Sequence, residues 1–391
     1  MLFIIPVNLP NLFLILLCVI VVLLLIYYLL ILGRYAFRKT SKTEGVSQSA
    51  FPPISVVVTS RDESHLIIHS LPSLLTQDYP NYEVVVVNDN SRDETEQLIR
   101  EFSFKYPHLH YVHLSDSVSN ISGKKFPLSI GIKSAKNECI VLTTVSSKPV
   151  SPFWLQHMAQ RFVKKTNVVV AFSGYEKSKG AGNSLLHYDN FVSYLNAFAY
   201  TLAKMPVLAN GSNLAYTKSF FFNNSATFFA HANLPFGEDD VFINKVSNQV
   251  SCEVQDHPDS FILRRKPNLA RWLSQKKWAC ISRQYYKSFP RFLLKFYNFL
   301  SLLFYVVLGF AAFYVIRDFV ALHSVHHIFM LSTLGGLFLI KETLQYVVLG
   351  KAAVKLQEKQ LIPGILLYDI LFSLLNPLIY LSSKFVRRKW R

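Results

Sequence analysis

Long apolar runs lie at both ends of the chain, and shorter apolar segments separated by polar loops lie between them. Residues 12–32 form a nearly unbroken apolar run, which is long enough to cross about 30 Å of hydrocarbon as a helix. Three more runs follow near the carboxyl end, at residues 296–316, within residues 319–349 and at residues 361–381. The pattern predicts α-helical transmembrane segments at both ends of the chain.

The charges that follow the first run set its expected orientation. The run has no basic stretch before it and no small-residue cleavage site after it, so a removable signal peptide is the less favoured interpretation. Basic residues come directly after it, at Arg34, Arg38, Lys39 and Lys42. By the positive-inside rule, we expect the amino terminus outside and the chain after Arg34 to begin in the cytoplasm.

The carboxyl-terminal runs give a conflicting topology. Lys341 and Glu342 mark the far end of the second of them. The third contains Pro363, Asp369 and Pro377. Three crossings would place the basic tail, residues 384–391, outside, whereas the positive-inside rule places it inside. We therefore expect the last run to bend at its prolines into a re-entrant or interfacial helix.

The most informative stretch in the middle of the chain is YEVVVVNDNSRDET, residues 82–95. Its four consecutive valines make a run that is apolar on both faces, which is typical of a central strand in a parallel sheet. Residues 53–63 indicate an earlier strand ending in a charged loop, and residues 65–75 a helix, so the order is β–loop–α–β. Because ligands bind beyond the carboxyl ends of such strands, we expect Asp89 to lie where a nucleotide would bind.

This order of motifs resembles the family-two glycosyltransferases of GT-A fold. The similarity includes a loop near Glu63, Gln-Asp-Tyr-Pro at residues 77–80 and the strand that ends at Asp89, and it extends over residues 53–286. The relatives it points to are membrane enzymes, among them cellulose, chitin and hyaluronan synthases and ceramide glucosyltransferases. The resemblance implies an α/β domain of GT-A fold, Rossmann-like with a mostly parallel sheet, on the cytoplasmic side of a bacterial inner membrane.

The resemblance also implies a set of residues that bind the nucleotide-sugar. This set is Thr59, Arg61, Glu63, Asp89 and Lys125. A lysine above the sheet edge neutralises a diphosphate in such a site, and the segment Gly123-Lys124-Lys125 supplies two candidates. A solvated surface lysine is the alternative interpretation, and it applies more to Lys124 than to Lys125.

The metal motif of the family is missing. The family normally has Asp-x-Asp after the next strand, and its carboxylates hold a divalent cation that bridges the donor phosphates. Here Thr144-Val145-Ser146 occupy those positions, followed by Ser147 and Lys148. Three possibilities follow: a weakened or differently assembled site for Mg²⁺ or Mn²⁺, neutralisation by Lys148 and other cations, or a degenerate donor site.

Two further motifs resemble the acceptor side and the catalytic base of the family. Residues 210–216, NGSNLAY, resemble a Gly-x-Asn-x-Ala-Tyr loop beside the acceptor, which implicates Gly211 and Asn213. The acidic run Glu238, Asp239 and Asp240 stands where the family has its Glu-Asp motif. An inverting transfer needs one carboxylate to take a proton from the acceptor hydroxyl, so Asp239 is the candidate base and Asp240 its alternative. A solvated acidic turn at the start of a helix is the competing interpretation.

Residues 271–286 mix basic and aromatic side chains, as expected for a helix on a membrane surface. Polymerising relatives carry Gln-x-x-Arg-Trp on such a helix. Gln275 matches that motif, but Trp278 and Ala279 stand where Arg and Trp would be. We assign Gln275 and Trp278 to the acceptor side, and the altered motif argues against processive polymer synthesis.

The net charge of +17 and the hydrophobic fraction of 51% fit a membrane protein. Much of the basic excess lies beside apolar runs, at residues 34–42, 264–287 and 384–391, where it attracts anionic lipids. We therefore expect membrane lipids as partners and no nucleic acid. The four cysteines have no paired spacing typical of a metal site.

These observations divide the chain into five parts. They are a transmembrane anchor (1–34), a polar linker (35–52), a GT-A domain (53–265), an interfacial region (266–292) and a membrane region with a basic tail (293–391). The expected function is inverting transfer of a sugar from a nucleotide-diphospho-sugar to a lipid-linked or glycan acceptor. The alternative is a non-catalytic subunit of an envelope-glycan assembly. A nucleotide-dependent oxidoreductase is disfavoured because no Gly-x-Gly-x-x-Gly follows the first strand.

Overall fold

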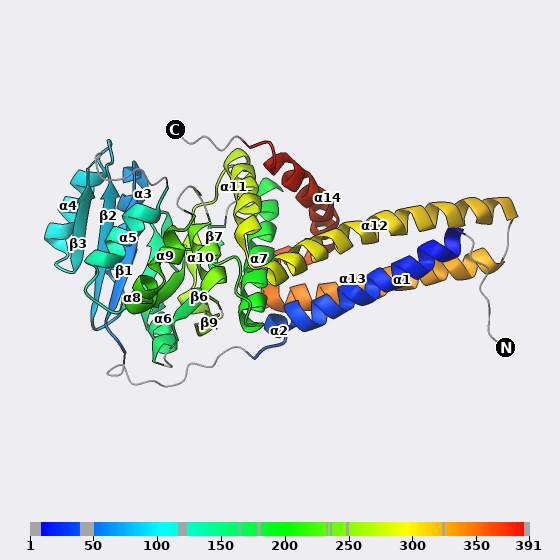
Figure 1. The fold of residues 1–391 in the computed structure, drawn as a ribbon, viewed down its shortest axis with the longest axis horizontal. Helices are drawn as coiled ribbons and strands as arrows, with labels where there is room; N and C mark the ends of the chain where they lie inside the picture. Colours follow the sequence, from blue (N-terminus) through cyan, green and yellow to red (C-terminus); the bar gives the residue numbers. More distant parts are fainter. Residues whose placement is uncertain are drawn as a thin grey trace.

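The computed structural model places an α/β domain at one end of the molecule and long helices at the other (Figure 1). It describes residues 9–39, 51–115, 123–163, 166–177, 181–231, 234, 237–247, 250–322 and 325–386. The basic residues Arg387, Arg388 and Lys389 and most of the polar linker lie outside the described residues.

The α/β domain is built on a seven-stranded sheet with the order β3-β2-β1-β4-β8-β6-β9. Its strands are β1 (Ile54–Ser60), β2 (Tyr82–Asp89), β3 (Leu109–Leu114), β4 (Cys139–Thr144), β6 (Val168–Ala171), β8 (Leu214–Thr217) and β9 (Cys252–Gln255). Strand β8 runs antiparallel to both of its neighbours, and the other pairs are parallel. The prediction of an α/β fold with a mostly parallel sheet is confirmed.

Helices cover both faces of this sheet. One face is covered by α3 (Ser64–Leu75), α4 (Thr95–Lys105) and α6 (Trp154–Phe162), and the other by α5 (Lys125–Ser134), α7 (Ala181–Leu202) and α10 (Glu238–Val246). The valines of β2 alternate between the two cores, and all four are fully buried. Gly131 of α5 lies against Val57 and Val87, where a Cβ would meet Val57 at 2.6 Å. The close approach of this helix to the sheet therefore requires glycine.

A second, three-stranded sheet brings distant segments together. It contains β5 (Ser147–Pro149), β7 (Ser173–Tyr175) and β10 (Ile262–Arg264), and β10 lies in the middle. Strand β10 pairs antiparallel with β5, with Arg264 opposite Ser147. The helices α8 (Lys218–Asn223), α9 (Ser225–Phe229) and α11 (Leu269–Ser282) complete the domain. The pairing of β10 with β5 places the basic residues after Leu263 beside the altered metal motif.

Four helices of the described part are long and apolar enough to cross a membrane. They are α1 (Leu9–Tyr27) with its continuation to Ala36, α12 (Ser288–Leu322), α13 (Val325–Lys355) and α14 (Ile365–Ser383). Helices α1, α12 and α13 lie side by side and extend away from the domain, whereas α14 lies at an angle to them and contacts α11 (Figure 1). The apolar segments predicted at both ends are present. Whether the tilted α14 crosses the membrane stays a prediction.

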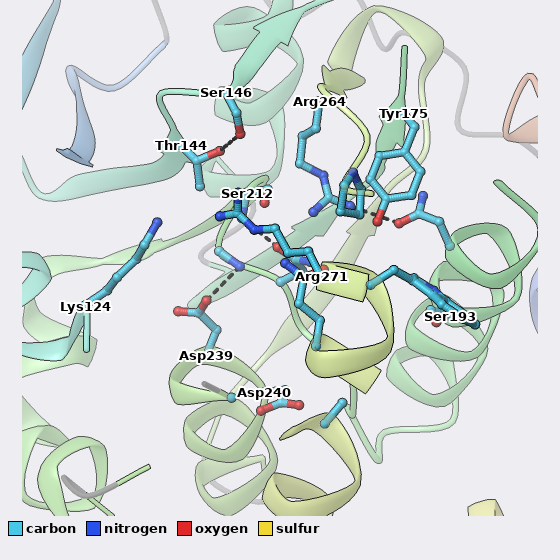
Figure 2. Close-up of a pocket in the computed structure, with 18 of the residues that line it drawn as sticks. Lys124, Thr144, Ser146, Tyr175, Ser193, Ser212, Asp239, Asp240, Arg264 and Arg271 are labelled. Atoms are coloured by element: carbon cyan, nitrogen blue, oxygen red, sulfur yellow. Dashed lines mark hydrogen bonds between the residues drawn. The ribbon is translucent and has the colours of Figure 1, made fainter. Parts of the chain in front are cut away.

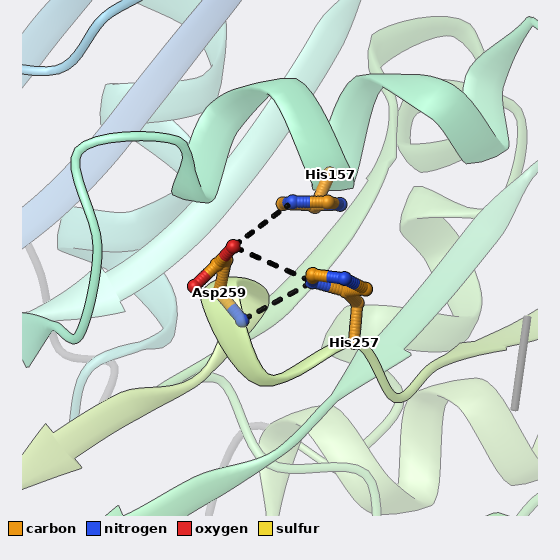
Figure 3. Close-up of side chains that lie close together, drawn as sticks. All are labelled: His157, His257 and Asp259. Carbon is orange, nitrogen blue, oxygen red and sulfur yellow. Dashed lines mark hydrogen bonds and ion pairs between the residues drawn. The ribbon is translucent and has the colours of Figure 1, made fainter. Parts of the chain in front are cut away.

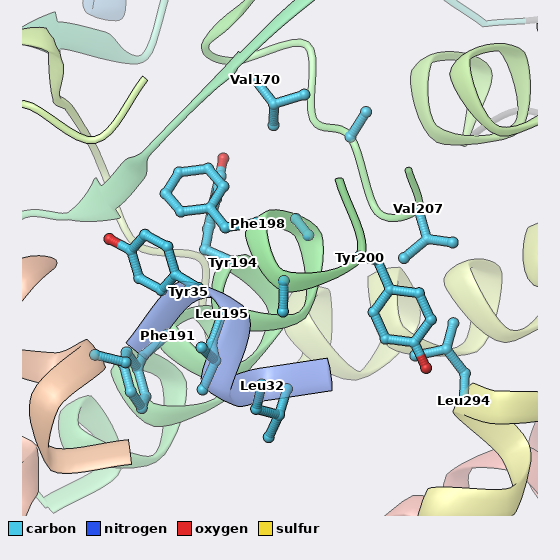
Figure 4. Packing of buried hydrophobic residues seen from close by; sticks show 14 of the residues in the cluster. Leu32, Tyr35, Val170, Phe191, Tyr194, Leu195, Phe198, Tyr200, Val207 and Leu294 are labelled. Atoms are coloured by element: carbon cyan, nitrogen blue, oxygen red, sulfur yellow. The ribbon is translucent and has the colours of Figure 1, made fainter. Parts of the chain in front are cut away.

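The end of the first apolar segment is fixed to the α/β domain. There the side chains of Leu32 and Tyr35 pack on Phe191, Leu195 and Phe198 of α7 (Figure 4). The ring of Tyr35 meets that of Phe198 edge to face, with the centroids 5.1 Å apart. This packing sets the position of the domain relative to the anchor.

The sequence suggested that Lys341 marks the far end of the second carboxyl-terminal run. The structure shows that the helix does not end there. Helix α13 continues past it to Lys355, and the Lys341 side chain is fully buried. Its Nζ lies 2.8 Å from a carboxylate oxygen of Glu342 and 2.8 Å from one of Asp369 on α14, and it donates to the Tyr305 hydroxyl at 2.9 Å. A lysine can be buried among apolar helices because these partners replace water around its charge.

Candidate functional site

A cavity of about 680 Å³ lies beyond the carboxyl ends of β1 and β4. Its wall is made by the loop after β1, the starts of α3, α5 and α10, the segment after β4, residues 208–212, residues 264–268 and one face each of α7 and α11. Figure 2 shows Lys124, Arg271, Thr144 and Asp239 around one space. This is the sheet edge at which the sequence placed the nucleotide.

The structure brings many of the predicted site residues into this cavity. Those that line it are Thr59, Glu63, Thr144, Ser146, Gly211, Asp239, Asp240 and Gln275. They come from segments more than 200 positions apart in the chain, so the fold alone joins them. The side chain of Glu238, the first residue of α10, lies outside the described residues.

Arg61 and Asp89 lie near the cavity without lining it. They form an ion pair with an N–O distance of 3.6 Å, and the Arg61 side chain is 59% exposed. Asp89 is the last residue of β2, which is the neighbour of β1 in the sheet. The pair therefore stands at the same edge of the sheet, beside the cavity wall.

Lys125 is not in the cavity, and Lys124 is. The Lys125 side chain is buried, and its ammonium group donates to the backbone oxygen of His231 at 2.5 Å and faces the Phe228 ring. Successive residues of a helix point about 100° apart, so a shift of one position turns the charge away from the sheet edge. The Gly-Lys-Lys pattern predicted a lysine here but pointed to the wrong one for a cavity contact.

Two residues assigned to the acceptor side have structural roles. Asn213 is fully buried and donates to the backbone oxygens of Phe172 and Ser260 at 2.7 and 2.9 Å. Trp278 is buried in a small apolar cluster with Leu234 and Ile281. Neither residue lines the cavity. The Asn213 side chain fixes the backbone beside the cavity, and Trp278 packs helix α11 into an apolar cluster.

Asp239 is positioned by the Gly211 loop. The backbone N–H of Gly211 donates to Asp239 Oδ2 at 2.8 Å. A Cβ on Gly211 would lie 2.9 Å from Asp239 Cγ and closer still to Oδ2. Glycine is required here because the carboxylate approaches the backbone directly.

Asp240 is held by a phenol and a backbone amide. The Tyr286 hydroxyl donates to Asp240 Oδ2 at 2.6 Å, and the backbone N–H of Val241 donates to Oδ1 at 2.7 Å. Burial and the negative charge of Asp240 raise the pKa of Tyr286 well above its usual value, so this phenol stays a proton donor. Both carboxylates line the cavity, and the assignment of Asp239 as the base stays a prediction.

The altered metal motif forms a cluster of hydroxyl groups. Thr144 Oγ1 lies 3.1 Å from Ser146 Oγ and 2.8 Å from Ser147 Oγ. The backbone N–H of Arg265 donates to the backbone oxygen of Ser146 at 3.3 Å, which holds the basic end of β10 beside this cluster. Hydroxyls are weak partners for a hard cation compared with carboxylates. The segment that carries Arg264, Arg265 and Lys266 therefore lies beside the place where the family holds its metal.

Basic residues outnumber acidic ones along the described cavity wall. The basic residues are Lys124, Arg264, Arg265, Lys266, Arg271, Lys276 and Arg283, and the acidic ones are Glu63, Asp189, Asp239 and Asp240. Burial raises the pKa of Glu63, and the nearby Lys124 and Arg271 offset only part of this rise. Sequence reasoning assigned residues 264–287 to the membrane flank. Three consecutive basic residues shortly before helix α11 were the signal that it missed.

One group of described residues outside the cavity has the composition of a metal site. It consists of His157, His257 and Asp259, whose ligand atoms lie within 4.8 Å of one another (Figure 3). The two imidazole rings are stacked, with centroids 3.9 Å apart. A metal ion must lie near the plane of each ring that binds it, and stacked rings offer no such shared position. Neither this stacked group nor the hydroxyl cluster of Thr144, Ser146 and Ser147 fits a divalent cation as it stands.

Comparison with known proteins identifies the domain. Residues 55–221 match the family model Glycosyl transferase family 2. The chain is 29% identical over 100 residues to probable glycosyltransferase YdaM of Bacillus subtilis, a match that covers 25% of this chain and 24% of that protein. It is 32% identical over 105 residues to poly-beta-1,6-N-acetyl-D-glucosamine synthase of Staphylococcus epidermidis, which covers 26% of this chain and 24% of that protein. The match thus spans about a quarter of each curated relative.

A solved structure agrees with the sequence match. Mannosyltransferase PcManGT from Pyrobaculum calidifontis, in complex with GDP-Man and Mn²⁺, has a TM-score of 0.51 and 18% identity, over 92% of this chain and 99% of that chain. At this identity the likeness concerns the fold alone. The resemblance and the fold class predicted from the sequence are thereby confirmed: residues 55–221 match the model of glycosyl transferase family 2, and they lie in a domain of GT-A fold.

Proposed function

We propose that the protein is an inverting glycosyltransferase that moves a sugar from a nucleotide-diphospho-sugar to a lipid-linked or glycan acceptor at the cytoplasmic face of the bacterial inner membrane. The observation that supports this most is the shared cavity, in which Asp239 faces a wall of basic and hydroxyl side chains. A base and an anion-binding wall are the two parts that such a transfer needs.

Asp239 would act on the acceptor. Its carboxylate takes the proton of the acceptor hydroxyl while that oxygen bonds to the anomeric carbon of the sugar. The bond from this carbon to the diphosphate oxygen breaks at the same time, and the electron pair leaves with the nucleoside diphosphate. Because the acceptor attacks the face opposite the leaving group, the anomeric configuration inverts.

The basic wall would bind the diphosphate in place of the family's cation. Lys124 and Arg271 extend into the cavity from two sides (Figure 2), and Arg264, Arg265 and Lys266 line the same cavity. Guanidinium and ammonium groups form charge-assisted hydrogen bonds with phosphate oxygens and balance the charge of the leaving group. Donor binding without a divalent cation is the expected consequence.

Calorimetric titration of UDP and GDP in magnesium, in manganese and in chelator tests this donor site. We expect binding to persist in chelator and to weaken about 10- to 100-fold in Arg271→Gln, as for a lost charge-assisted bond. Lys277→Gln is the matched control, because Lys277 lies on the same helix α11 outside the cavity wall. Binding that strictly requires metal contradicts the proposal.

A non-catalytic role is the second candidate, and the absence of both Asp-x-Asp carboxylates favours it. Incubation with UDP- and GDP-sugars and extracted membrane lipids distinguishes the two. In an enzyme, Asp239→Asn abolishes transfer and leaves nucleotide binding nearly intact. Nucleotide binding without transfer or hydrolysis in the unaltered protein would establish the non-catalytic role.

The orientation can be tested separately. Phe104 on α4 is 89% exposed, so a cysteine placed there reports on the side of the membrane that holds the domain. With the domain in the cytoplasm, a membrane-impermeant maleimide labels Phe104→Cys only after the cells are opened. Labelling in intact cells would reverse the proposed topology.

A further inference from the structure

A second cavity, of about 400 Å³, lies between the α/β domain and the membrane helices. Its walls come mainly from α7, α11, α12 and α14, with further residues from the anchor, the loop before β8, the α11–α12 connection and α13: Leu32, Leu208, Arg283, Tyr286 and Leu349. It shares Asp189, Ser193, Leu208, Lys276 and Arg283 with the first cavity. The two cavities are therefore separated by a single layer of side chains.

The second cavity has a basic part and an apolar part. The basic part consists of Lys276, Arg283, Arg291 and Lys295. The apolar part includes Leu294, Phe299, Leu302, Leu349, Phe372 and Ile379. This combination matches an amphiphile with an anionic head and a hydrocarbon tail, whereas a nucleotide would leave its polar groups against the apolar wall.

Most of the cationic groups in the basic part are not paired with a described carboxylate. Of its four residues, only Lys276 forms an ion pair with a described carboxylate, that of Asp189 at 2.5 Å. The Nε of Arg283 is buried and has no hydrogen-bond partner among the described atoms. Arg291 donates to the backbone oxygen of Gln284 at 2.5 Å, and Lys295 lies over the Tyr380 ring. A buried guanidinium N–H without a partner is costly, and a phosphate oxygen would satisfy it.

The apolar part lies between two helices that are suited to lipid. Helices α12 and α14 are both long and apolar enough to span a membrane, and α14 leans away from the bundle (Figure 1). They are in contact through the hydroxyls of Ser301 and Ser373, which lie 2.7 Å apart. The side-chain amide of Asn376 also donates a hydrogen bond to Asn298 Oδ1 at 3.3 Å. The one described acid at this end, Asp369, is already paired with Lys341. An acyl chain thus meets no unpaired charge from these residues.

The end of α11 connects the second cavity with the candidate base. A Cβ added to Gly237, just before α10, would lie 2.5 Å from Ser282 Cβ, so the two segments are in close contact. Arg283 follows Ser282, and Asp239 follows Gly237 by two positions. A headgroup held by Arg283 therefore lies next to the turn that carries Asp239.

We propose that the second cavity binds the acceptor, a membrane lipid whose headgroup carries both a phosphate and a hydroxyl. The phosphate lies against Arg283, Arg291 and Lys295, the chain lies between α12 and α14, and the hydroxyl extends into the first cavity toward Asp239. This inference rests on the proposed transferase function, because it names the acceptor of that reaction.

Cys280 gives a direct measure of occupancy because it lines the second cavity. Burial raises the pKa of the Cys139 and Cys252 thiols to about 12, so these two react slowly. The full chain with Cys18→Ser is placed in nanodiscs of phosphatidylcholine, with or without phosphatidylglycerol, and treated with maleimide. We expect phosphatidylglycerol to slow labelling of Cys280 about tenfold in the unaltered cavity.

Arg291→Gln and Lys295→Gln should remove this protection, because both residues line only the second cavity. Arg291→Lys, which keeps the charge, should retain most of it, and Lys277→Gln should retain all of it. Equal labelling in both lipids, or protection that survives both glutamine variants, overturns the proposal. Protection by soluble glycerol phosphate alone also overturns it, because the ligand would then be a free phosphate ester.

The experiment separates this proposal from the proposed function. Asp239→Asn should keep lipid protection while losing transfer. In the active protein, Arg291→Gln should raise the KM for phosphatidylglycerol, or for a lipid of the same headgroup chemistry, and leave the KM for the donor unchanged. Protection without any transfer in the unaltered protein would reject the transferase function and keep the lipid site.

Discussion

Replacing Gly211 with alanine should cut sugar transfer sharply and leave nucleotide binding nearly unchanged. In the structure the Gly211 N–H donates to Asp239 Oδ2 at 2.8 Å, and there is no room for a side chain between them. The new Cβ would lie 2.9 Å from Asp239 Cγ and closer still to Oδ2, so the carboxylate must retreat by about 1 Å to reach van der Waals separation. The hydrogen bond from Gly211 is then lost or badly bent.

The size of the effect follows from these two changes. A hydrogen bond to a charged group contributes about 1.5–3 kcal/mol, and about 1.4 kcal/mol corresponds to a tenfold change in rate. Misplacement of a catalytic group by about 1 Å costs up to about 100-fold. We therefore expect the rate of the Gly211→Ala variant to fall about 10- to 100-fold.

The assay is release of nucleoside diphosphate from a saturating sugar donor, together with calorimetric binding of the same nucleotide. Gly182→Ala is the matched control, since nothing lies within 4 Å of a Cβ at that position of α7. It should leave both measurements unchanged. A Gly211→Ala variant with the full rate and an unchanged melting temperature would refute the assignment of Asp239 as a base held by this loop.

Three further predictions concern stability and reactivity. Lys341→Met should lower the free energy of unfolding by about 3–5 kcal/mol in detergent, because Glu342 and Asp369 lose their buried cation. The double variant Lys341→Met with Asp369→Asn should recover part of this loss. An unchanged melting temperature of Lys341→Met would contradict the prediction. Desolvation raises the pKa of Asp93, but hydrogen bonds from the starts of α3 and α4 outweigh it and lower the pKa to about 2. The resulting stability is present above the unfolded pKa of about 4 and is lost as the pH falls toward 2. In Asp93→Asn, the melting temperature should therefore fall less between about pH 4 and pH 2 than in the unaltered protein. The Cys139 thiol, whose pKa burial raises to about 12, should react with maleimide at neutral pH only after unfolding, and fast labelling of the folded protein would exclude the buried position.

The local order of apolar and polar residues was enough to predict the strands and helices that surround the first cavity. The four valines of β2 are hydrophobic on both faces, and no position other than a central strand buries them all. The order of strand, loop and helix then placed the ligand edge, and Thr59, Glu63, Gly211, Asp239 and Gln275 do line the cavity found there. The apolar runs likewise predicted the long helices, because few other arrangements bury some twenty apolar residues in a row.

The remaining features depended on contacts between distant segments. Lys124 and Lys125 look alike in sequence, and only the rotation of α5 against the sheet decides which one enters the cavity. Asn213 looked like a substrate contact until the fold surrounded it with backbone oxygens.

The charge pattern of both cavities was also decided by tertiary structure. The pairing of β10 with β5 moves Arg264–Lys266 from an apparent membrane flank to the altered metal motif, and the approach of α14 pairs Asp369 with Lys341. The sequence by itself determined the strands, helices and apolar segments, because burial and backbone preference act over a few neighbouring residues. Which charges meet was decided by the tertiary structure, because electrostatic partners are chosen by distance in space and not by separation along the chain.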